Sequence, residues 1–215
     1  MKILLLFFYL TALGQQPDSL DKQVNALHDS IISIDTHNDF AMKYAFPEEK
    51  TTVKKGQVSF ELMKKGRLDA AFFAAYQAQG PRTEEDHIRA KERADSMLTG
   101  LQRYAAENAA LGGIALSASE IKALKAQGKA ALIMSIENAY CLGNELRLVA
   151  HYYNMGVRMI GLTHNGNNEL ADAATDSITE HGGLSGFGCR VIQEMNRLGI
   201  IVDVSHASRL ACLLA

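Results

Sequence analysis

The chain has 215 residues, of which 47% are hydrophobic and 21% are charged, and its formal net charge is −2. This composition is that of an ordinary globular domain, and it excludes a disordered or low-complexity chain. The near-neutral charge balance gives no electrostatic basis for binding nucleic acid, so we expect no such partner. The three cysteines are too few and too scattered for a disulfide framework or a zinc ribbon.

Residues 1–14 have the pattern of a secretory signal peptide. Lys2 precedes an apolar run over residues 3–13, which is too short to cross a bilayer. The small residues Ala12 and Gly14 place the expected cleavage site after Gly14. We therefore expect an exported protein, periplasmic or extracellular, with no stable membrane span. The alternative is that this run is a buried N-terminal strand.

The rest of the chain alternates between predicted helices and strands. Residues 15–30 form an N-terminal helical segment, because Leu20, Val24 and Leu27 recur at helical spacing. Further helices are expected over residues 59–65, 83–104, 119–127, 144–155 and 185–198. Strands are expected over residues 31–34, 69–76, 130–136, 157–162 and 200–204. Most of these strands are apolar on both faces, which indicates an α/β fold with a parallel sheet covered by helices.

Ionisable side chains follow four of the five predicted strands: His37 with Asp39, Glu137, His164 and His206. In a (β/α)₈ barrel the carboxyl ends of the strands meet on one face, so these side chains can form one site. Imidazole and carboxylate groups are suitable ligands for zinc and related ions. A carboxylate such as Glu137 can bridge two metals, and a pair of ions about 3.5–4 Å apart can hold a hydroxide that attacks a carbonyl.

Each of these residues also has a purely structural interpretation. Glu137 could be an ordinary strand-end acid, His164 a helix cap or loop hydrogen-bond partner, and His206 a core histidine. A lone His-x-Asp pair, such as His37 and Asp39, is likewise a weak signal by itself, but four strand ends in the same phase favour a shared site over separate coincidences. The remaining histidines lie in predicted helices or a glycine-rich loop and are interpreted as surface or structural residues: His28, His87, His151 and His181.

Four segments, Ile34–Asp39, Ser135–Asn138, Gly156–Asp172 and Gly183–His206, together resemble the membrane (renal) dipeptidase family, peptidase family M19. The resemblance runs from about Asp35 to Ser208. It implies a TIM-barrel enzyme that holds two zinc ions and hydrolyses dipeptides.

The resemblance also implies a role for each strand-end residue. His37, Asp39 and Glu137 would bind metal, with Glu137 bridging the two ions, and His206 would be a ligand of the second ion. His164 would contact the substrate and help to polarise the scissile carbonyl. Glu137 and His164 are thus the candidate catalytic residues, and His164 is also the candidate substrate-binding residue.

The chain departs from the family pattern in two respects. Asn138 and Ala139 stand where many relatives have two glycines, which would alter the local loop without removing the ligand. The family's second histidine ligand of the second metal, its substrate-binding arginine and its catalytic aspartate fall beyond the His206 strand, so the second zinc site is incomplete.

Five strands are also fewer than the eight of a closed barrel. We therefore expect residues 31–215 to form a barrel truncated after about five of its eight strands, with absent or impaired dipeptidase activity. The alternatives are a non-catalytic metal-binding fragment and another amidohydrolase-type hydrolase, although those enzymes usually open with His-x-His. A homo-oligomer stays possible.

Overall fold

The structure is a computed structural model, and it describes residues 19–46 and 57–215. The expected signal segment, residues 1–14, lies outside the described residues. The chain divides into two compact units, residues 1–32 and residues 33–215. In the first unit, helix α1 (Ser19–Ser30) forms where the apolar spacing predicts a helix.

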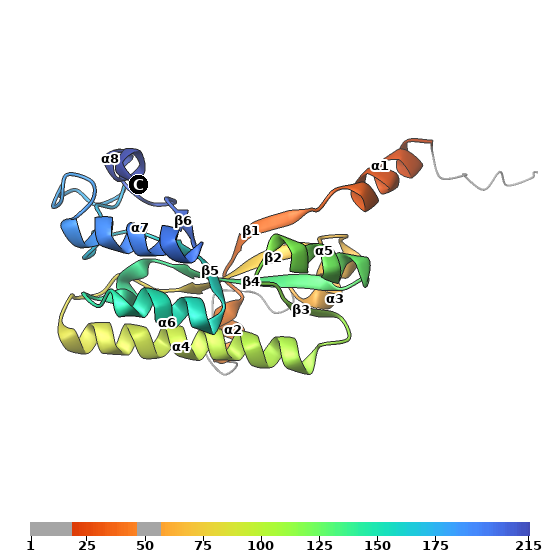
Figure 1. The fold of residues 1–215 in the computed structure, drawn as a ribbon, viewed down its shortest axis with the longest axis horizontal. Helices are drawn as coiled ribbons and strands as arrows, with labels where there is room; N and C mark the ends of the chain where they lie inside the picture. Colours follow the sequence, from red (N-terminus) through yellow and green to blue (C-terminus); the bar gives the residue numbers. More distant parts are fainter. Residues whose placement is uncertain (1–18, 47–56) are drawn as a thin grey trace, which may run out of the picture. The chain divides into compact units, whose positions relative to one another are not determined.

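The second unit is built on one parallel sheet with helices between its strands (Figure 1). Its strands are β1 (Ile34–Asn38), β2 (Ala70–Tyr76), β3 (Gly112–Ile114), β4 (Ala130–Glu137), β5 (Val157–Gly161) and β6 (Ile201–Asp203). Its helices are α2 (Ala41–Ala45), α3 (Phe60–Lys65), α4 (Glu84–Glu107), α5 (Ala118–Ala126), the 3₁₀ helix η1 (Ala139–Leu142), α6 (Arg147–Met155), α7 (Gly186–Leu198) and α8 (Arg209–Leu214). The order of strands across the sheet is β1-β2-β4-β5-β6, and β3 pairs with β4.

Two strands correct the sequence-based prediction. The first strand was expected over residues 31–34, but pairing with β2 begins only at Ile34, opposite Ala70. Strand β1 therefore includes Asp35 and His37, which were expected to follow the strand, and its register with β2 shifts between Asp35 and Asn38. Strand β3 was not predicted, because two glycines in three residues are unfavourable for a strand. It forms because it pairs with the start of β4. Position 112 requires glycine, because a β-carbon there would lie 2.5 Å from the ring of Phe60.

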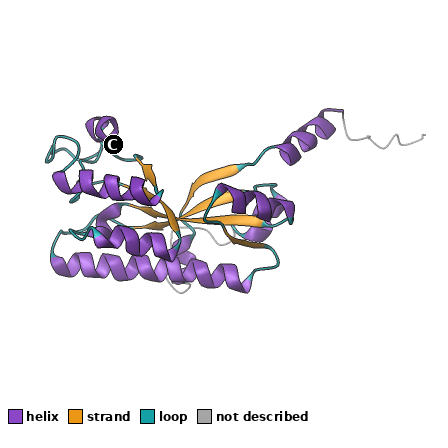
Figure 2. Cartoon of the chain, in the orientation of Figure 1, coloured by secondary structure: helices purple, strands orange, loops and turns teal. Residues whose placement is uncertain are grey.

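Alternating side chains of the two central strands divide between the two faces of the sheet. Strands β2 and β4 are buried along almost their whole length. One face carries core residues toward the helices: Ala71, Phe73 and Ala75 from β2, with Leu132, Met134 and Ile136 from β4. Helix α4 packs on β2 and β4, α6 on β5, and α7 on both β6 and α6. Figure 2 shows the strands and the helices that accompany them in separate colours.

The opposite face of the sheet is open. It lines an apolar cavity of about 400 Å³ that includes Phe72, Ile133 and, at its two edges, Ile34 and Ile201. Those two edge residues are 45% and 52% exposed. Parallel strands with helices between them and an open inner face form a half-barrel, which confirms the predicted α/β class. Each helix in residues 19–46 and 57–215 is too short or too polar to span a bilayer.

Candidate metal centre

The five predicted site residues lie together at the carboxyl edge of the sheet. His37 belongs to β1 and Asp39 follows it, whereas Glu137 is the last residue of β4. His164 and His206 follow β5 and β6. Because all paired strands are parallel, residues more than a hundred positions apart meet at this edge.

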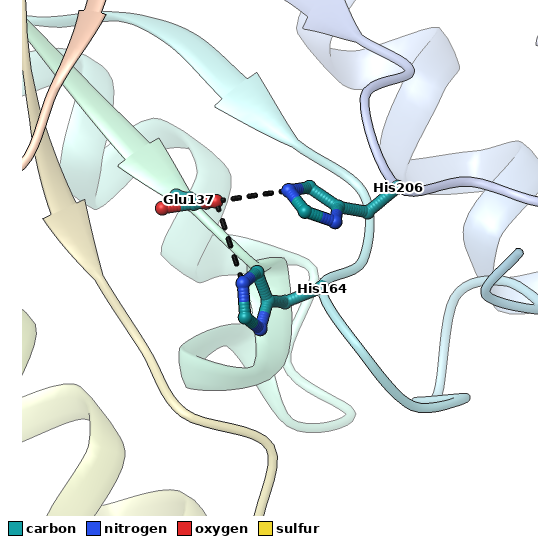
Figure 3. A group of neighbouring side chains, drawn as sticks. All are labelled: Glu137, His164 and His206. Atoms are coloured by element: carbon teal, nitrogen blue, oxygen red, sulfur yellow. Dashed lines mark ion pairs between the residues drawn. The ribbon is translucent and has the colours of Figure 1, made fainter. Parts of the chain in front are cut away.

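Glu137 is at the centre of the group, and its two carboxylate oxygens face different partners. Oε2 lies 3.3 Å from Nε2 of His37, which is also 3.2 Å from Oδ1 of Asp39. Oε1 lies 3.3 Å from Nε2 of His206 and 3.7 Å from Nε2 of His164 (Figure 3). Two groups of candidate metal ligands therefore share this one carboxylate, and in each group the ligand atoms lie within 4.8 Å of one another.

The spacing of these atoms fits a metal. Ligand atoms bound tetrahedrally at the usual zinc distances of about 2.0–2.1 Å lie about 3.3 Å from one another. The separations from His37 to Asp39, from His37 to Glu137 and from Glu137 to His206 are 3.2, 3.3 and 3.3 Å. Nitrogen and oxygen donors of this kind suit zinc and related divalent ions.

A cavity of about 180 Å³ opens beside the shared carboxylate. It is lined by Thr36, His37, Glu137, Met159, Asp203, Ser205 and His206. The Glu137 side chain is only 10% exposed, but those of His37 and Asp39 are 40% and 49% exposed. The centre is therefore accessible to a small ligand from solvent.

The carboxylates stabilise positive charge at this position. The hydrogen bond to Asp39, followed by the one to Glu137, raises the pKa of His37 to about 10. The same contact with His37 lowers the pKa of Asp39, although burial opposes this effect. Burial lowers the pKa of His164, against the attraction of Glu137. His164 is therefore a neutral imidazole at neutral pH, whereas His37 holds a proton where the geometry would place a cation.

Asn138, the residue after Glu137, is one of the two positions at which the chain departs from the glycines of the family pattern. Asn138 has a φ of +69°, in the half of the map that favours glycine. Its buried side chain accepts a hydrogen bond from Nδ2 of Asn168 at 2.9 Å. Asn168 in turn donates to the carbonyl of Leu162 at 2.7 Å. The loops after β4 and β5 are thus joined next to Glu137.

His206 is the second residue of the centre with an unusual backbone. Its φ is +64°, a conformation that costs energy for a residue with a side chain and that is often found at functional sites. Its carbonyl accepts a hydrogen bond from the backbone N–H of Ala174 at 2.7 Å, and the N–H of Ala207 donates to Val204 at 3.1 Å. This turn directs the imidazole toward Glu137 (Figure 3).

Sequence reasoning missed three residues that hold the centre: Tyr76, Asn138 as a hydrogen-bonding residue, and Asn168. Tyr76 ends an apolar strand and was interpreted only as part of it, but its hydroxyl lies 3.4 Å from Nδ1 of His164. The signal available in the sequence was position for Tyr76 and Asn138, which lie at or just beyond a predicted strand end, whereas Asn168 lies further along the loop after the 157–162 strand.

The other histidines lie outside both groups of ligands within the described part of the chain. Nε2 of His87 lies 3.1 Å from Glu169, and that of His151 lies 2.9 Å from Asp95. Nε2 of His181 lies 2.8 Å from the backbone carbonyl of Asn168.

Comparison with known proteins identifies the family. The sequence profile of the membrane dipeptidase family (peptidase family M19) matches residues 21–214, and the chain belongs to this family. Dipeptidase verJ of Clonostachys rogersoniana is 31% identical over 208 residues, which cover 89% of this chain and 52% of that protein. Dipeptidase 3 of Rattus norvegicus is 28% identical over 204 residues, which cover 88% of this chain and 39% of that protein.

A solved structure gives the same assignment. The probable dipeptidase PvdM from Pseudomonas aeruginosa superposes with a TM-score of 0.78 at 27% identity, covering 90% of this chain and 51% of that one. The chain spans about half the length of the curated relatives it matches.

Proposed function

We propose that the chain carries the metal centre of an exported zinc dipeptidase and that the substrates of this centre are dipeptides. The observation that carries the proposal is the division of the Glu137 carboxylate, with Oε2 toward His37 and Oε1 toward His206. A carboxylate in this position can bridge two ions.

The donor atoms suggest how the ions would be held. His37, Asp39 and Oε2 of Glu137 would hold one zinc ion, and Oε1 of Glu137 and His206 would contribute to a second. When bound, the two ions would supply Lewis acidity and a strong nucleophile at neutral pH. Nε2 of His164 lies 3.7 Å from Oε1 of the same carboxylate, so His164 would stabilise negative charge on the carbonyl oxygen of a dipeptide bound beside it.

The two sites should differ in affinity. The first has three donors from this chain, whereas the second has the shared carboxylate and His206 as its proposed ligands. We expect close to one tightly held zinc per 215-residue chain by elemental analysis. Glu137→Gln should weaken that binding by more than about 100-fold, whereas His206→Gln should leave it in place. His151→Gln, on helix α6, serves as the control. Two tight ions per monomer, or tight binding that survives Glu137→Gln, would contradict this assignment.

A second candidate function is metal binding without turnover. The exposure of His37, Asp39 and His206 favours it, since their side chains are 40%, 49% and 36% exposed, and hydrolytic centres usually exclude water from the reacting groups. The two candidates separate in a hydrolysis assay of the zinc-loaded chain, with dipeptides carrying an L- or a D-residue at the carboxyl end. Turnover that disappears in Glu137→Gln supports the dipeptidase, and zinc binding without turnover supports the second candidate.

Export is proposed from the pattern of residues 1–14. Protein secreted by a bacterial host should begin at or near Gln15, as read by N-terminal sequencing. Recovery of soluble cytoplasmic protein that retains Met1 would oppose this part of the proposal.

A further inference from the structure

We propose that Tyr76 is a positioning residue of the centre, whose hydroxyl holds His164 in the tautomer with its proton on Nε2. His164 then acts as a hydrogen-bond donor toward the substrate and not as a further metal ligand. The inference rests on the proposed function for one point only, that the dipeptide carbonyl reaches this centre.

Tyr76 lies on the strand next to Glu137. It is the last residue of β2 and is paired in register with Glu137 on β4, so both side chains leave the same face of the sheet. Its ring meets the ring of His164 edge-on, with the centroids 4.8 Å apart and the planes at 69°. The ring of His206 lies on His164 as well, at 4.5 Å. The imidazole of His164 is therefore held by two neighbouring rings.

The surroundings of its two nitrogens determine the tautomer of His164. A neutral imidazole has one N–H donor and one acceptor nitrogen, and the partner of one nitrogen fixes the state of the other. Nε2 lies 3.7 Å from Oε1 of Glu137, and an ionised carboxylate only accepts hydrogen bonds. The opposite tautomer would direct a nitrogen lone pair at this oxygen, which is repulsive. The proton therefore belongs on Nε2.

Nδ1 must then accept a hydrogen bond, and the described part of the chain places the Tyr76 hydroxyl there, at 3.4 Å. A phenol carries its proton throughout the neutral range and can donate it to Nδ1. The distance is long for such a bond, as is common in catalytic sites before substrate is bound. Both ends of the imidazole thus favour the same tautomer.

This tautomer decides between two roles that the geometry alone permits. His164 belongs to one of the two groups of candidate ligands, with Glu137 and His206. A metal ligand needs a free lone pair on Nε2, whereas stabilisation of a carbonyl oxygen needs an N–H at the same position. By donating to Nδ1, Tyr76 assigns His164 to the second role.

The test reads the tautomer directly and needs no turnover. Histidine in the whole chain is labelled with ¹⁵N, the seven histidines are observed by long-range ¹H–¹⁵N correlation at mildly alkaline pH, and His164→Gln identifies the signals of His164. Nε2 should give a pyrrole-type signal both without and with zinc. Tyr76→Phe, which keeps the ring, should change the tautomer ratio about fivefold to tenfold in favour of Nδ1–H. Tyr153→Phe, on helix α6, should leave the ratio unchanged.

Several results would overturn the inference. A pyridine-type or zinc-bound Nε2 in the unaltered chain would do so without any variant, and so would a ratio that is unchanged in Tyr76→Phe. If zinc fails to bind while His164 keeps its Nε2–H tautomer in a Tyr76-dependent way, the proposed function fails and the role of Tyr76 stands. If zinc binds but His164 does not carry its proton on Nε2, the proposed function stands and the role of Tyr76 fails.

Discussion

Replacing Asn138 tests how the loop that follows β4 is held. Its φ of +69° favours glycine, and its buried amide makes four hydrogen bonds. Nδ2 donates to the carbonyl of Gln77 at 3.0 Å and to Oε1 of Gln79 at 3.2 Å. Oδ1 accepts from the backbone N–H of Tyr140 at 3.3 Å and from Nδ2 of Asn168 at 2.9 Å. Glycine at this position keeps the backbone conformation but loses the amide, and alanine loses the amide while still straining the backbone.

The two substitutions should therefore differ by the backbone cost alone. Loss of the amide bonds, partly replaced by water, should lower the free energy of unfolding by about 1–3 kcal/mol in Asn138→Gly. A β-carbon at positive φ costs about 1–2 kcal/mol more, so Asn138→Ala should be the less stable variant by about that amount. Gly128→Ala is a reference for the cost of a β-carbon at positive φ without a steric clash, because Gly128 has a φ of +67° and a β-carbon there would meet nothing within 4 Å.

Urea unfolding followed by far-ultraviolet circular dichroism measures these differences, and the absence of tryptophan rules out the usual fluorescence signal. The expected order of stability is unaltered chain, Asn138→Gly, Asn138→Ala, with Gly128→Ala about 1 kcal/mol below the unaltered chain. The reasoning is refuted if Asn138→Ala is as stable as Asn138→Gly while Gly128→Ala is destabilised. It is equally refuted if neither Asn138 variant loses stability.

Three further predictions follow from single contacts. Burial would raise the pKa of Asp172, but hydrogen bonds from three backbone N–H groups, at 2.8–3.0 Å, lower it. Asp172→Asn should therefore cost about 2–3 kcal/mol at neutral pH in urea unfolding, and the difference should shrink as the pH falls through the lowered pKa, because the protonated carboxyl no longer gives this stabilisation. Gly188→Ala should cost about 3 kcal/mol in the same assay, since a β-carbon would lie 2.2 Å from the carbonyl oxygen of Leu170, and an unchanged midpoint would contradict this contact. Burial raises the pKa of the Cys141 thiol to about 12, so a thiol reagent should titrate only the two exposed cysteines in the folded chain and all three in urea.

The sequence by itself determined the elements whose signals are local. Strands β2 and β4 are apolar on both faces and are bounded by polar residues, so their type and position were predictable. The helix caps were also readable, since the hydroxyls of Thr83 and Ser185 accept the backbone N–H bonds expected of residues that begin α4 and α7. The residue types at the strand ends predicted a metal centre, because parallel strands bring those ends to one edge.

The tertiary structure alone decided which atoms of that centre meet. Strand β3 depends on pairing with β4, and the start of β1 is set by its register with β2, neither of which leaves a periodic signal in the sequence. The division of the Glu137 oxygens between His37 and His206 likewise depends on the relative positions of three strands. So does the approach of Tyr76 to His164, 88 residues further along the chain. Hydrophobic periodicity reports which face of an element is buried, whereas contacts between strand ends depend on pairing register and on the turns that follow, and these are fixed only when the whole sheet is formed.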